Sequence, residues 1–283
     1  MKSLLFLYFC VAMAFSAMAS SVSDTYVIPN PQQMVCGDGH FVLRAQASFS
    51  CNLTGTDKDD FVSYVSNSPL SLTYKKKGKA DITFKLVSPE NAKMKEEAYR
   101  LKVTKKGIQA EATSASGLFY AFQSIVQLAR ESGSGTYRLP EVTIEDAPRF
   151  SYRGMHLDVS RHFYTKEFVK KQIDALARYK LNRFHWHLTD GAGWRIEIKK
   201  YPELTRETAY RPFPDWKSWW NGGRTYCRQD APGASGGYYT QEDVKEIVEY
   251  ARERHITVIT EIEMPAHTEE VLDARPQLAW GGD

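Results

Sequence analysis

Short runs in which hydrophobic and polar residues alternate occupy much of the first half of the chain. Residues 82–87, 99–103 and 108–110 show this alternation, which is typical of strands that bury one face. Farther along, hydrophobic residues recur at helical spacing and predict a helix over residues 115–130. We therefore expect residues 20–146 to form an α+β domain. The buried stripe of its helix is expected to contain Leu118, Phe122, Ile125, Val126 and Ala129.

The pattern changes after Pro148, where predicted strands alternate with predicted helices. The strand-like runs are residues 154–159, 184–188 and 256–262. Between them, Thr165 and Thr240 are expected to cap amphipathic helices, and Thr240–Asp243 has the form of a capping box. This repeated order indicates parallel strands in one sheet, so residues 147–283 are predicted to form an α/β domain. The expected buried stripes are Val169, Ile173, Leu176 and Ala177 on the first helix and Val244, Ile247, Val248 and Ala251 on the second.

Each predicted strand of the second half ends in a group of polar residues. These groups are residues 158–162, 185–190 and 261–267. Ligands of parallel α/β folds bind outside the carboxyl ends of the strands, so we expect the three groups to form one site.

All six tryptophans also lie in the second half, and three of them lie in a loop over residues 211–237. Their rings are expected either to contact a sugar ring or to pack as a lid or an interface. These three are Trp216, Trp219 and Trp220.

The first residues of the chain have the pattern of an export signal. Lys2 precedes an apolar run over residues 4–15, and Ala17-Met18-Ala19 supplies the small residues of a cleavage site. The apolar run is shorter than the roughly 20 residues that span a bilayer. We therefore expect residues 1–19 to be removed, leaving no membrane anchor and a periplasmic or extracellular protein.

Charge and cysteine content narrow the classes of partner. The chain carries 37 basic and 34 acidic side chains over 283 residues, without a basic cluster, so a nucleic-acid partner is not expected. We expect a small or neutral partner instead.

After cleavage of the export signal, three cysteines remain, Cys36, Cys51 and Cys227, and only Cys36 and Cys51 are near each other in sequence. All three are interpreted as structural, and no Cys-x-x-Cys motif indicates a zinc site.

Three motifs of the second half resemble those of family 20 glycoside hydrolases, the β-N-acetylhexosaminidases. They are Tyr152–Phe163, then His187–Asp190 with Gly193–Arg195, then Glu261–His267, and they match in order and spacing. The resemblance implies an α+β N-terminal domain followed by the first three βα units of an incomplete (β/α)8 TIM barrel. It also implies hydrolysis of terminal β-linked N-acetylglucosamine or N-acetylgalactosamine from amino-sugar-containing glycans. In that reaction the configuration is retained, no metal or cofactor takes part, and the substrate's acetamido oxygen is the nucleophile.

The resemblance also implies roles for individual residues. Arg161 would hold the outer hydroxyls of the sugar. Asp190 and His267 would form a hydrogen-bonded relay that supports a general-acid Glu and tunes its pKa. Glu263 would line the site, and His187 would orient its neighbours.

The chain departs from the family pattern in three places. Ala266 replaces a usual Gly, and Gly191-Ala192 replaces a more polar pair. The catalytic Asp-Glu pair of the family, which follows a fourth strand, has no counterpart, although residues 281–283 resemble its beginning. Such a barrel takes about 250 residues, roughly twice the span of residues 147–283. We therefore expect a C-terminally truncated, marginally folded and hydrolytically inactive chain.

Two other functions remain open from sequence. One is a metal-dependent TIM-barrel hydrolase, because His185 and His187 share a strand face and His267 follows a nearby strand. The other is a module that binds amino sugars without cleaving them. The sequence leaves open the preferred sugar, the linkage and the oligomeric state.

Overall fold

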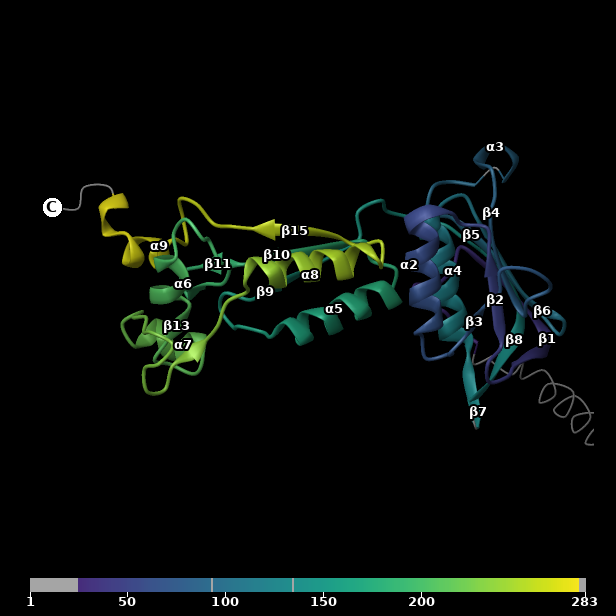
Figure 1. The fold of residues 1–283 in the computed structure, drawn as a ribbon, viewed down its shortest axis with the longest axis horizontal. Helices are drawn as coiled ribbons and strands as arrows, with labels where there is room; N and C mark the ends of the chain where they lie inside the picture. Colours follow the sequence, from purple (N-terminus) through teal and green to yellow (C-terminus); the bar gives the residue numbers. More distant parts are fainter. Residues whose placement is uncertain (1–24, 93, 134, 280–283) are drawn as a thin grey trace, which may run out of the picture.

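A computed structural model describes residues 25–92, 94–133 and 135–279 of the chain. The predicted export signal over residues 1–19 and the predicted loop over residues 281–283 lie outside these ranges. No helix in the described ranges is both long and apolar enough to cross a membrane. The described chain forms two units that follow each other along its longest axis (Figure 1).

The first unit is a mixed sheet covered on one face by helices. Within the described residues its eight strands include a continuous order β1-β8-β5-β6-β4-β2-β3, with β7 paired to β8. The β1, β8, β5 and β6 neighbours are antiparallel, whereas β6, β4, β2 and β3 pair in parallel. The elements are β1 (Gln33–Leu43), β2 (Ser48–Cys51), α2 (Gly55–Ser66), β3 (Thr73–Tyr74), β4 (Ile82–Leu86), α3 (Pro89–Ala92), β5 (Tyr99–Thr104), β6 (Gly107–Ala112), α4 (Ala115–Leu128), β7 (Arg130–Gly133) and β8 (Thr136–Asp146).

Helix α4 is buried on nearly all sides, which the sequence pattern did not predict. Its N-cap residue Ser114 accepts a hydrogen bond from the Gly117 backbone, and every residue from 117 to 125 is buried. The helix lies between the sheet and the second unit (Figure 1). Leu118, Phe122 and Ile125 of the predicted stripe are buried, whereas Val126 and Ala129 are only partly buried. The helix ends at Leu128 rather than at Arg130, because the chain leaves there to form β7.

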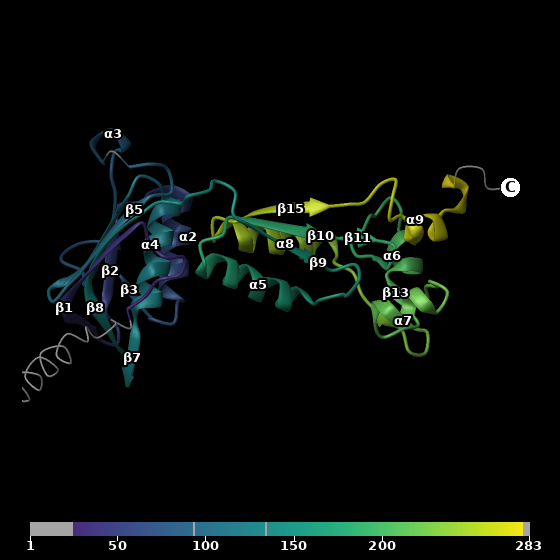
Figure 2. The same ribbon diagram turned by 180° about the vertical axis from the view of Figure 1, so that it is seen from behind.

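The second unit contains the predicted parallel sheet. Its order is β15-β10-β9, and both pairs are parallel, as expected. Helices α5 and α8 cover one face of this sheet in both ribbon views (Figures 1 and 2). The elements are β9 (Gly154–Asp158), α5 (Lys166–Arg178), β10 (Arg183–His187), α8 (Gln241–Arg252) and β15 (Thr257–Glu261).

Local sequence signals account for these two helices. The Thr165 side chain accepts a hydrogen bond from the Phe168 backbone at the start of α5. The Thr240 and Asp243 side chains form the predicted capping box at the start of α8. The predicted stripe of α5 is buried, and on α8 Ile247 and Ala251 are buried. Val248 contradicts the prediction, because it is 43% exposed on the outer side of α8.

Short elements gather at the carboxyl end of the parallel strands. A two-stranded hairpin follows β10 directly, and a second antiparallel strand pair and three short helices surround it (Figure 1). These elements are β11 (Thr189–Asp190), β12 (Gly193–Trp194), α6 (Glu203–Thr208), β13 (Tyr210–Arg211), α7 (Trp216–Asn221), β14 (Ser235–Gly236), α9 (Glu269–Ala274) and the 3-10 turn η1 (Pro276–Leu278).

The sheet order excludes a disulfide between Cys36 and Cys51. Cys36 lies on β1 and Cys51 on β2, with four strands between them. Five strand spacings amount to roughly 24 Å, far beyond the reach of a disulfide. Cys227 lies in the second unit, where its backbone pairs with Tyr210.

Candidate active site

Arg161 is fixed at the end of β9 by a turn around Asp158. The Asp158 carboxylate accepts hydrogen bonds from the backbone N–H groups of Ser160, at 2.9 Å, and Arg161, at 3.0 Å. Its second oxygen, Oδ2, lies 2.8 Å from Arg161 Nη1. The other terminal nitrogen, Nη2, forms an ion pair with Asp190. Arg161 therefore joins the end of β9 to the hairpin that follows β10.

Three basic side chains surround the Asp190 carboxylate. Besides Arg161, His267 Nδ1 lies 3.6 Å and His187 Nε2 lies 3.8 Å from Asp190 Oδ2. Asp190 is buried, and burial raises its pKa above the ordinary value even though Arg161 and both imidazoles act to lower it. The structure thus brings the predicted pair Asp190 and His267 together with Arg161.

Glu263 approaches the same ring nitrogen of His187 as Asp190 does. Its Oε1 is 3.7 Å from His187 Nε2, and its backbone N–H donates to Thr189 Oγ1 at 3.0 Å. His187 is buried, and both carboxylates, of Asp190 and of Glu263, face its Nε2. All four residues predicted for the site lie at the carboxyl ends of the parallel strands.

A second group of imidazoles surrounds Glu261, one step down the strands. His185 Nε2 lies 2.7 Å and His156 Nε2 lies 3.5 Å from Glu261 Oε2, and His187 Nδ1 lies 3.9 Å away. Burial acts to raise the pKa of Glu261, but His187 and the hydrogen bond with Glu263, together with the other two imidazoles, hold it below the ordinary value.

Sequence reasoning missed His156 in this group. The strand register places His156 opposite His185, and His187 opposite Glu261. The signal was the alternation along each strand, since residues two apart face the same side of a sheet. To predict the group from this alternation, one must also know the register between strands that lie far apart in the sequence.

The side chains that could hold a metal ion differ from the predicted set. Two groups in the described ranges have ligand atoms within 4.8 Å of one another, His156 with His187 and Glu261, and His187 with Asp190 and Glu263. Neither includes His185 or His267, which the metal hypothesis requires as ligands. The sequence left open an ion held by His185, His187 and His267, and these three do not form such a group in the described ranges.

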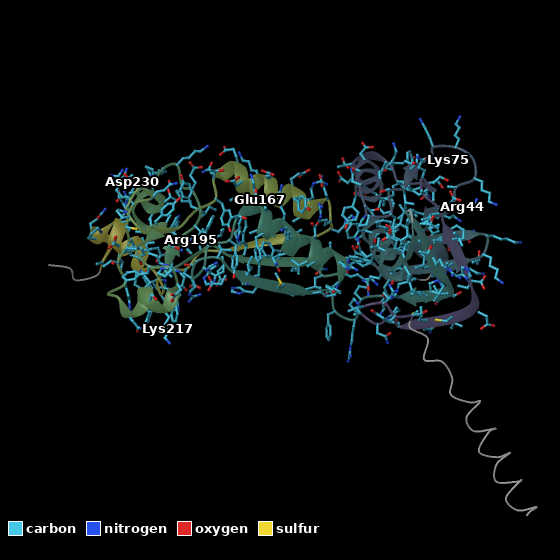
Figure 3. All side chains as sticks on the ribbon, turned by 90° about the horizontal axis from the view of Figure 1, so that it is seen from below. Arg44, Lys75, Glu167, Arg195, Lys217 and Asp230 are labelled. Carbon is cyan, nitrogen blue, oxygen red and sulfur yellow. The ribbon has the colours of Figure 1, made fainter. Side chains whose placement is uncertain are left out.

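A buried arginine supports the hairpin that carries Asp190. Arg195 donates to backbone carbonyl groups rather than to a carboxylate, including Ser160 O at 2.7 Å and Ala192 O at 3.2 Å. Burial, assisted by the charge of Arg211, lowers the pKa of Arg195 to about 10. Figure 3 shows Arg195 within the cluster of loops, with Lys217 and Asp230 toward its edges. Arg195 thus holds β9, the hairpin and the following loops at fixed positions.

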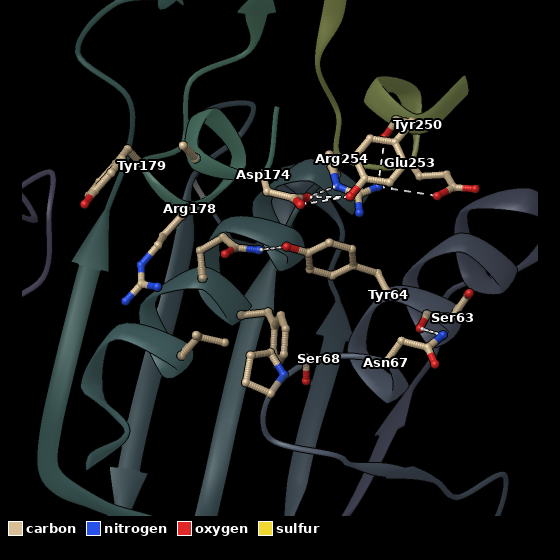
Figure 4. Close-up of a pocket in the computed structure, with 15 residues that line it drawn as sticks. Ser63, Tyr64, Asn67, Ser68, Asp174, Arg178, Tyr179, Tyr250, Glu253 and Arg254 are labelled. Atoms are coloured by element: carbon tan, nitrogen blue, oxygen red, sulfur yellow. Dashed lines mark hydrogen bonds and ion pairs between the residues drawn. The ribbon is translucent and has the colours of Figure 1, made fainter. Parts of the chain in front are cut away.

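One cavity between the two units lies away from these polar groups. It has a volume of about 670 Å³ and is lined by residues of both units, among them Tyr64, Arg178, Tyr250 and Arg254 (Figure 4). Inside it, Asp174 accepts hydrogen bonds from Arg254 Nε, at 2.7 Å, and Tyr250 Oη, at 2.9 Å. The helix ends that line it lie at the amino ends of the strands, since the helices run antiparallel to them. The cavity is therefore separate from the candidate active site.

Comparison with known proteins identifies related sequences over nearly the whole described chain. The model of glycosyl hydrolase family 20, domain 2, matches residues 24–147, and that of the family 20 catalytic domain matches residues 150–282. A β-hexosaminidase of Vibrio furnissii is 37% identical over 271 residues, which cover 94% of this chain and 42% of that protein. A β-hexosaminidase of Porphyromonas gingivalis is 47% identical over 192 residues, covering 66% of this chain and 23% of that protein.

Solved structures of the same family share the fold. The exo β-N-acetylglucosaminidase of Vibrio harveyi in complex with N-acetylglucosamine matches with a TM-score of 0.77 at 33% identity, covering 93% of this chain and 41% of that one. The β-N-acetylhexosaminidase of Bacteroides fragilis matches with a TM-score of 0.74 at 33% identity, covering 89% of this chain and 48% of that one. These structures are TIM-barrel enzymes, so the predicted partial barrel is confirmed. The chain spans less than half the length of each of these four proteins.

Proposed function

Because the chain belongs to glycosyl hydrolase family 20, we propose that its polar strand ends hold the terminal sugar in a β-N-acetylhexosaminidase. The substrates of that enzyme would be glycans ending in β-linked N-acetylglucosamine or N-acetylgalactosamine. The proposal is carried by the convergence of Arg161, His187 and His267 on the Asp190 carboxylate. A Vibrio harveyi relative of similar fold is solved with N-acetylglucosamine, which supports this sugar as the ligand.

Arg161 is proposed to bind the hydroxyl groups of the terminal sugar. Its guanidinium has five N–H donors in a rigid fork, and Asp158 and Asp190 engage only part of them. The side chain is 34% exposed, so its remaining donors can reach a ligand. The two carboxylates fix the direction of the fork, which reduces the entropy lost when a sugar binds.

Asp190 and His267 are proposed to act as a relay behind the general acid. With Nδ1 toward Asp190, His267 has its second ring nitrogen, Nε2, left for a carboxyl group. The buried Asp190 would orient the imidazole and stabilise its charged form. We propose the retaining, substrate-assisted reaction, in which the acetamido oxygen attacks the anomeric carbon while a Glu protonates the leaving oxygen.

The 283 residues contain no adjacent Asp-Glu pair that could supply this acid and orient the acetamide. We therefore propose that a polypeptide of these residues binds the amino sugar without cleaving it.

Export to the periplasm or the cell exterior is also proposed, on the pattern of residues 1–19. A mature protein whose first residue is still Met1 would contradict export.

Isothermal titration calorimetry with N-acetylglucosamine tests the binding proposal. We expect Arg161→Ala to weaken binding about 10- to 100-fold, because hydrogen bonds from a charged donor are lost. Arg206→Ala is the matched control, since Arg206 is an exposed arginine on α6 that pairs with its neighbour Glu207. Equal affinity of the two variants would overturn the role of Arg161. Turnover of a chromogenic N-acetylglucosaminide by the 283-residue chain would overturn binding without cleavage.

A further inference from the structure

Helix α7 exposes two tryptophan rings near the candidate active site. Trp216 is 41% and Trp220 is 44% exposed, whereas Trp219 of the same helix is only 1% exposed. The Asp215 side chain caps the helix by accepting a hydrogen bond from the Ser218 backbone at 2.9 Å. Helix α7 therefore buries one of the three rings and exposes the other two.

The exposed rings are held in a fixed arrangement. Trp219 anchors the helix, and its Nε1 donates to Thr225 O at 3.1 Å. The rings of Trp216 and Trp220 have centroids 5.4 Å apart with an interplanar angle of 32°. The Arg224 guanidinium lies 3.5 Å from the centroid of the Trp220 ring. The Arg224 guanidinium therefore lies over one face of the Trp220 ring, and the two rings and the cation adjoin one another on one surface.

Direct contacts connect this surface to the loop that carries Asp190. Tyr226, whose ring packs 5.9 Å from that of Trp219, donates a hydrogen bond from its hydroxyl group to the Gly191 carbonyl. Arg224 pairs with Glu269 at 3.6 Å, and the Glu269 carboxylate lies against the Gly191 Cα. Gly191 follows Asp190 in the chain. The tryptophan surface therefore lies at the same end of the molecule as the sugar-binding residues (Figure 1).

We propose that Trp216, Trp220 and Arg224 bind the sugar units that follow the terminal amino sugar in a β-linked oligosaccharide. Aromatic rings offer flat apolar faces that match the C–H faces of a pyranose, and a guanidinium offers donors to its hydroxyls. Two rings are too small an area for a stable protein interface. This inference rests on the proposed function, because it extends the Arg161–Asp190 site along the same glycan.

Calorimetric titration of the 283-residue chain with chitotetraose and with N-acetylglucosamine separates the two sites. We expect chitotetraose to bind more tightly than the monosaccharide. Trp216→Leu should weaken chitotetraose binding about tenfold and leave N-acetylglucosamine binding unchanged. Trp216→Phe keeps an aromatic face at the same position and should retain most of the affinity. If both variants show the far-ultraviolet circular dichroism of the wild type, a folding defect is excluded.

Tyr152→Ala is the matched control for loss of an exposed aromatic ring. Tyr152 is 57% exposed near the amino end of β9, and Arg183 lies 6.0 Å from the centroid of its ring. We expect this variant to bind both ligands as the wild type does.

Four results would overturn part or all of this proposal. The proposed role of the tryptophan surface is rejected if the wild type binds the two ligands with equal affinity. It is also rejected if Trp216→Leu and Trp216→Phe bind chitotetraose with equal affinity. The Arg161 site still stands in that case if Arg161→Ala weakens N-acetylglucosamine binding. Chitotetraose binding that depends on Trp216 but not on Arg161 supports the surface and rejects the role of Arg161. If the wild type binds neither sugar, both proposals fail.

Discussion

The pKa values of two neighbouring carboxyl groups in the candidate active site are shifted in opposite directions, because their surroundings differ. Burial raises the pKa of Asp190, and its three basic neighbours only partly oppose the effect. At Glu261 the effect of burial is outweighed by His187, Glu263 and the other imidazoles, so its pKa falls below the ordinary value. Burial dominates at Asp190, whereas the neighbouring imidazoles and Glu263 dominate at Glu261, so the two pKa values shift in opposite directions.

Glu270 gives the stability of the chain a pH dependence. Its side chain is 0% exposed, and burial, with the nearby charges of Asp190 and Glu269, raises its pKa from 4.5 to about 8. The folded state keeps the proton while the unfolded state loses it, so this contribution to stability is complete below pH 4.5 and is lost as the pH rises to about 8. We expect Glu270→Gln to remove this loss and to stabilise the chain at pH 8 by a few kcal/mol.

Urea denaturation of the wild type and Glu270→Gln across this pH range measures the effect. Asp273→Asn is a suitable control, because Asp273 lies one turn away on the same helix and is less buried. A difference in unfolding free energy between wild type and Glu270→Gln that does not change with pH would contradict the prediction.

At the scale of elements, the hairpin β11–β12 depends on close packing around two glycines. A β-carbon on Gly193, whose φ is +157°, would overlap the buried Arg195 guanidinium. A β-carbon on Gly191 would overlap the Glu269 carboxylate instead, which is the end of a flexible and partly exposed side chain. The departure from the family at Gly191 therefore has a local explanation, since it makes room for Glu269.

This contrast predicts different costs for two similar substitutions. We expect Gly193→Ala to destabilise the chain by about 1–3 kcal/mol, because neither the β-carbon nor the buried Arg195 has space to move. Gly191→Ala should cost less than half as much, since Glu269 can turn away. Chemical denaturation of both variants gives the two free energies. Equal costs would show that the position of Arg195 does not determine the packing of the hairpin.

Local signals explain which elements could be predicted from sequence. The caps at Thr165 and Thr240, the stripes of α5 and α8 and the parallel order each depend on residues close together in the chain. The same motifs placed Arg161 and Asp190 at neighbouring strand ends. The packing of α4 on all sides depends on contacts between the two units, and the group around Glu261 depends on register between distant strands. Such information is not present in any single segment.

For the whole molecule, a polar cluster joins the two units beside α4. Arg153, just before β9, makes two hydrogen bonds to Glu97 of the first unit, at 3.0 and 3.2 Å. Tyr120 Oη donates to the same carboxylate at 3.0 Å, and so does Asn182 Nδ2 at 3.3 Å. Burial acts to raise the pKa of Glu97, but the hydrogen bonds and charge of Arg153 hold it below the ordinary value.

Removing this carboxylate charge is expected to weaken the connection between the units. Glu97→Gln should lower the unfolding free energy by about 2–3 kcal/mol, because the half-buried Arg153 loses its counter-ion. Hydrogen exchange should also increase in residues 151–155 relative to the core of each unit. Glu96→Gln is the control, since Glu96 is an exposed carboxylate one position earlier. Unchanged stability and exchange in Glu97→Gln would show that apolar contacts alone join the units.

The uneven distribution of tryptophan gives the molecule a built-in optical label. The first unit has none, while Trp186, Trp194, Trp216, Trp219 and Trp220 all belong to the second. Emission excited at the red edge of the absorption band therefore reports the second unit alone, whereas the amide bands in the far ultraviolet report both. When the chain is heated, two curves that coincide would indicate a single cooperative transition. A separation between them would identify which unit melts first without any attached dye.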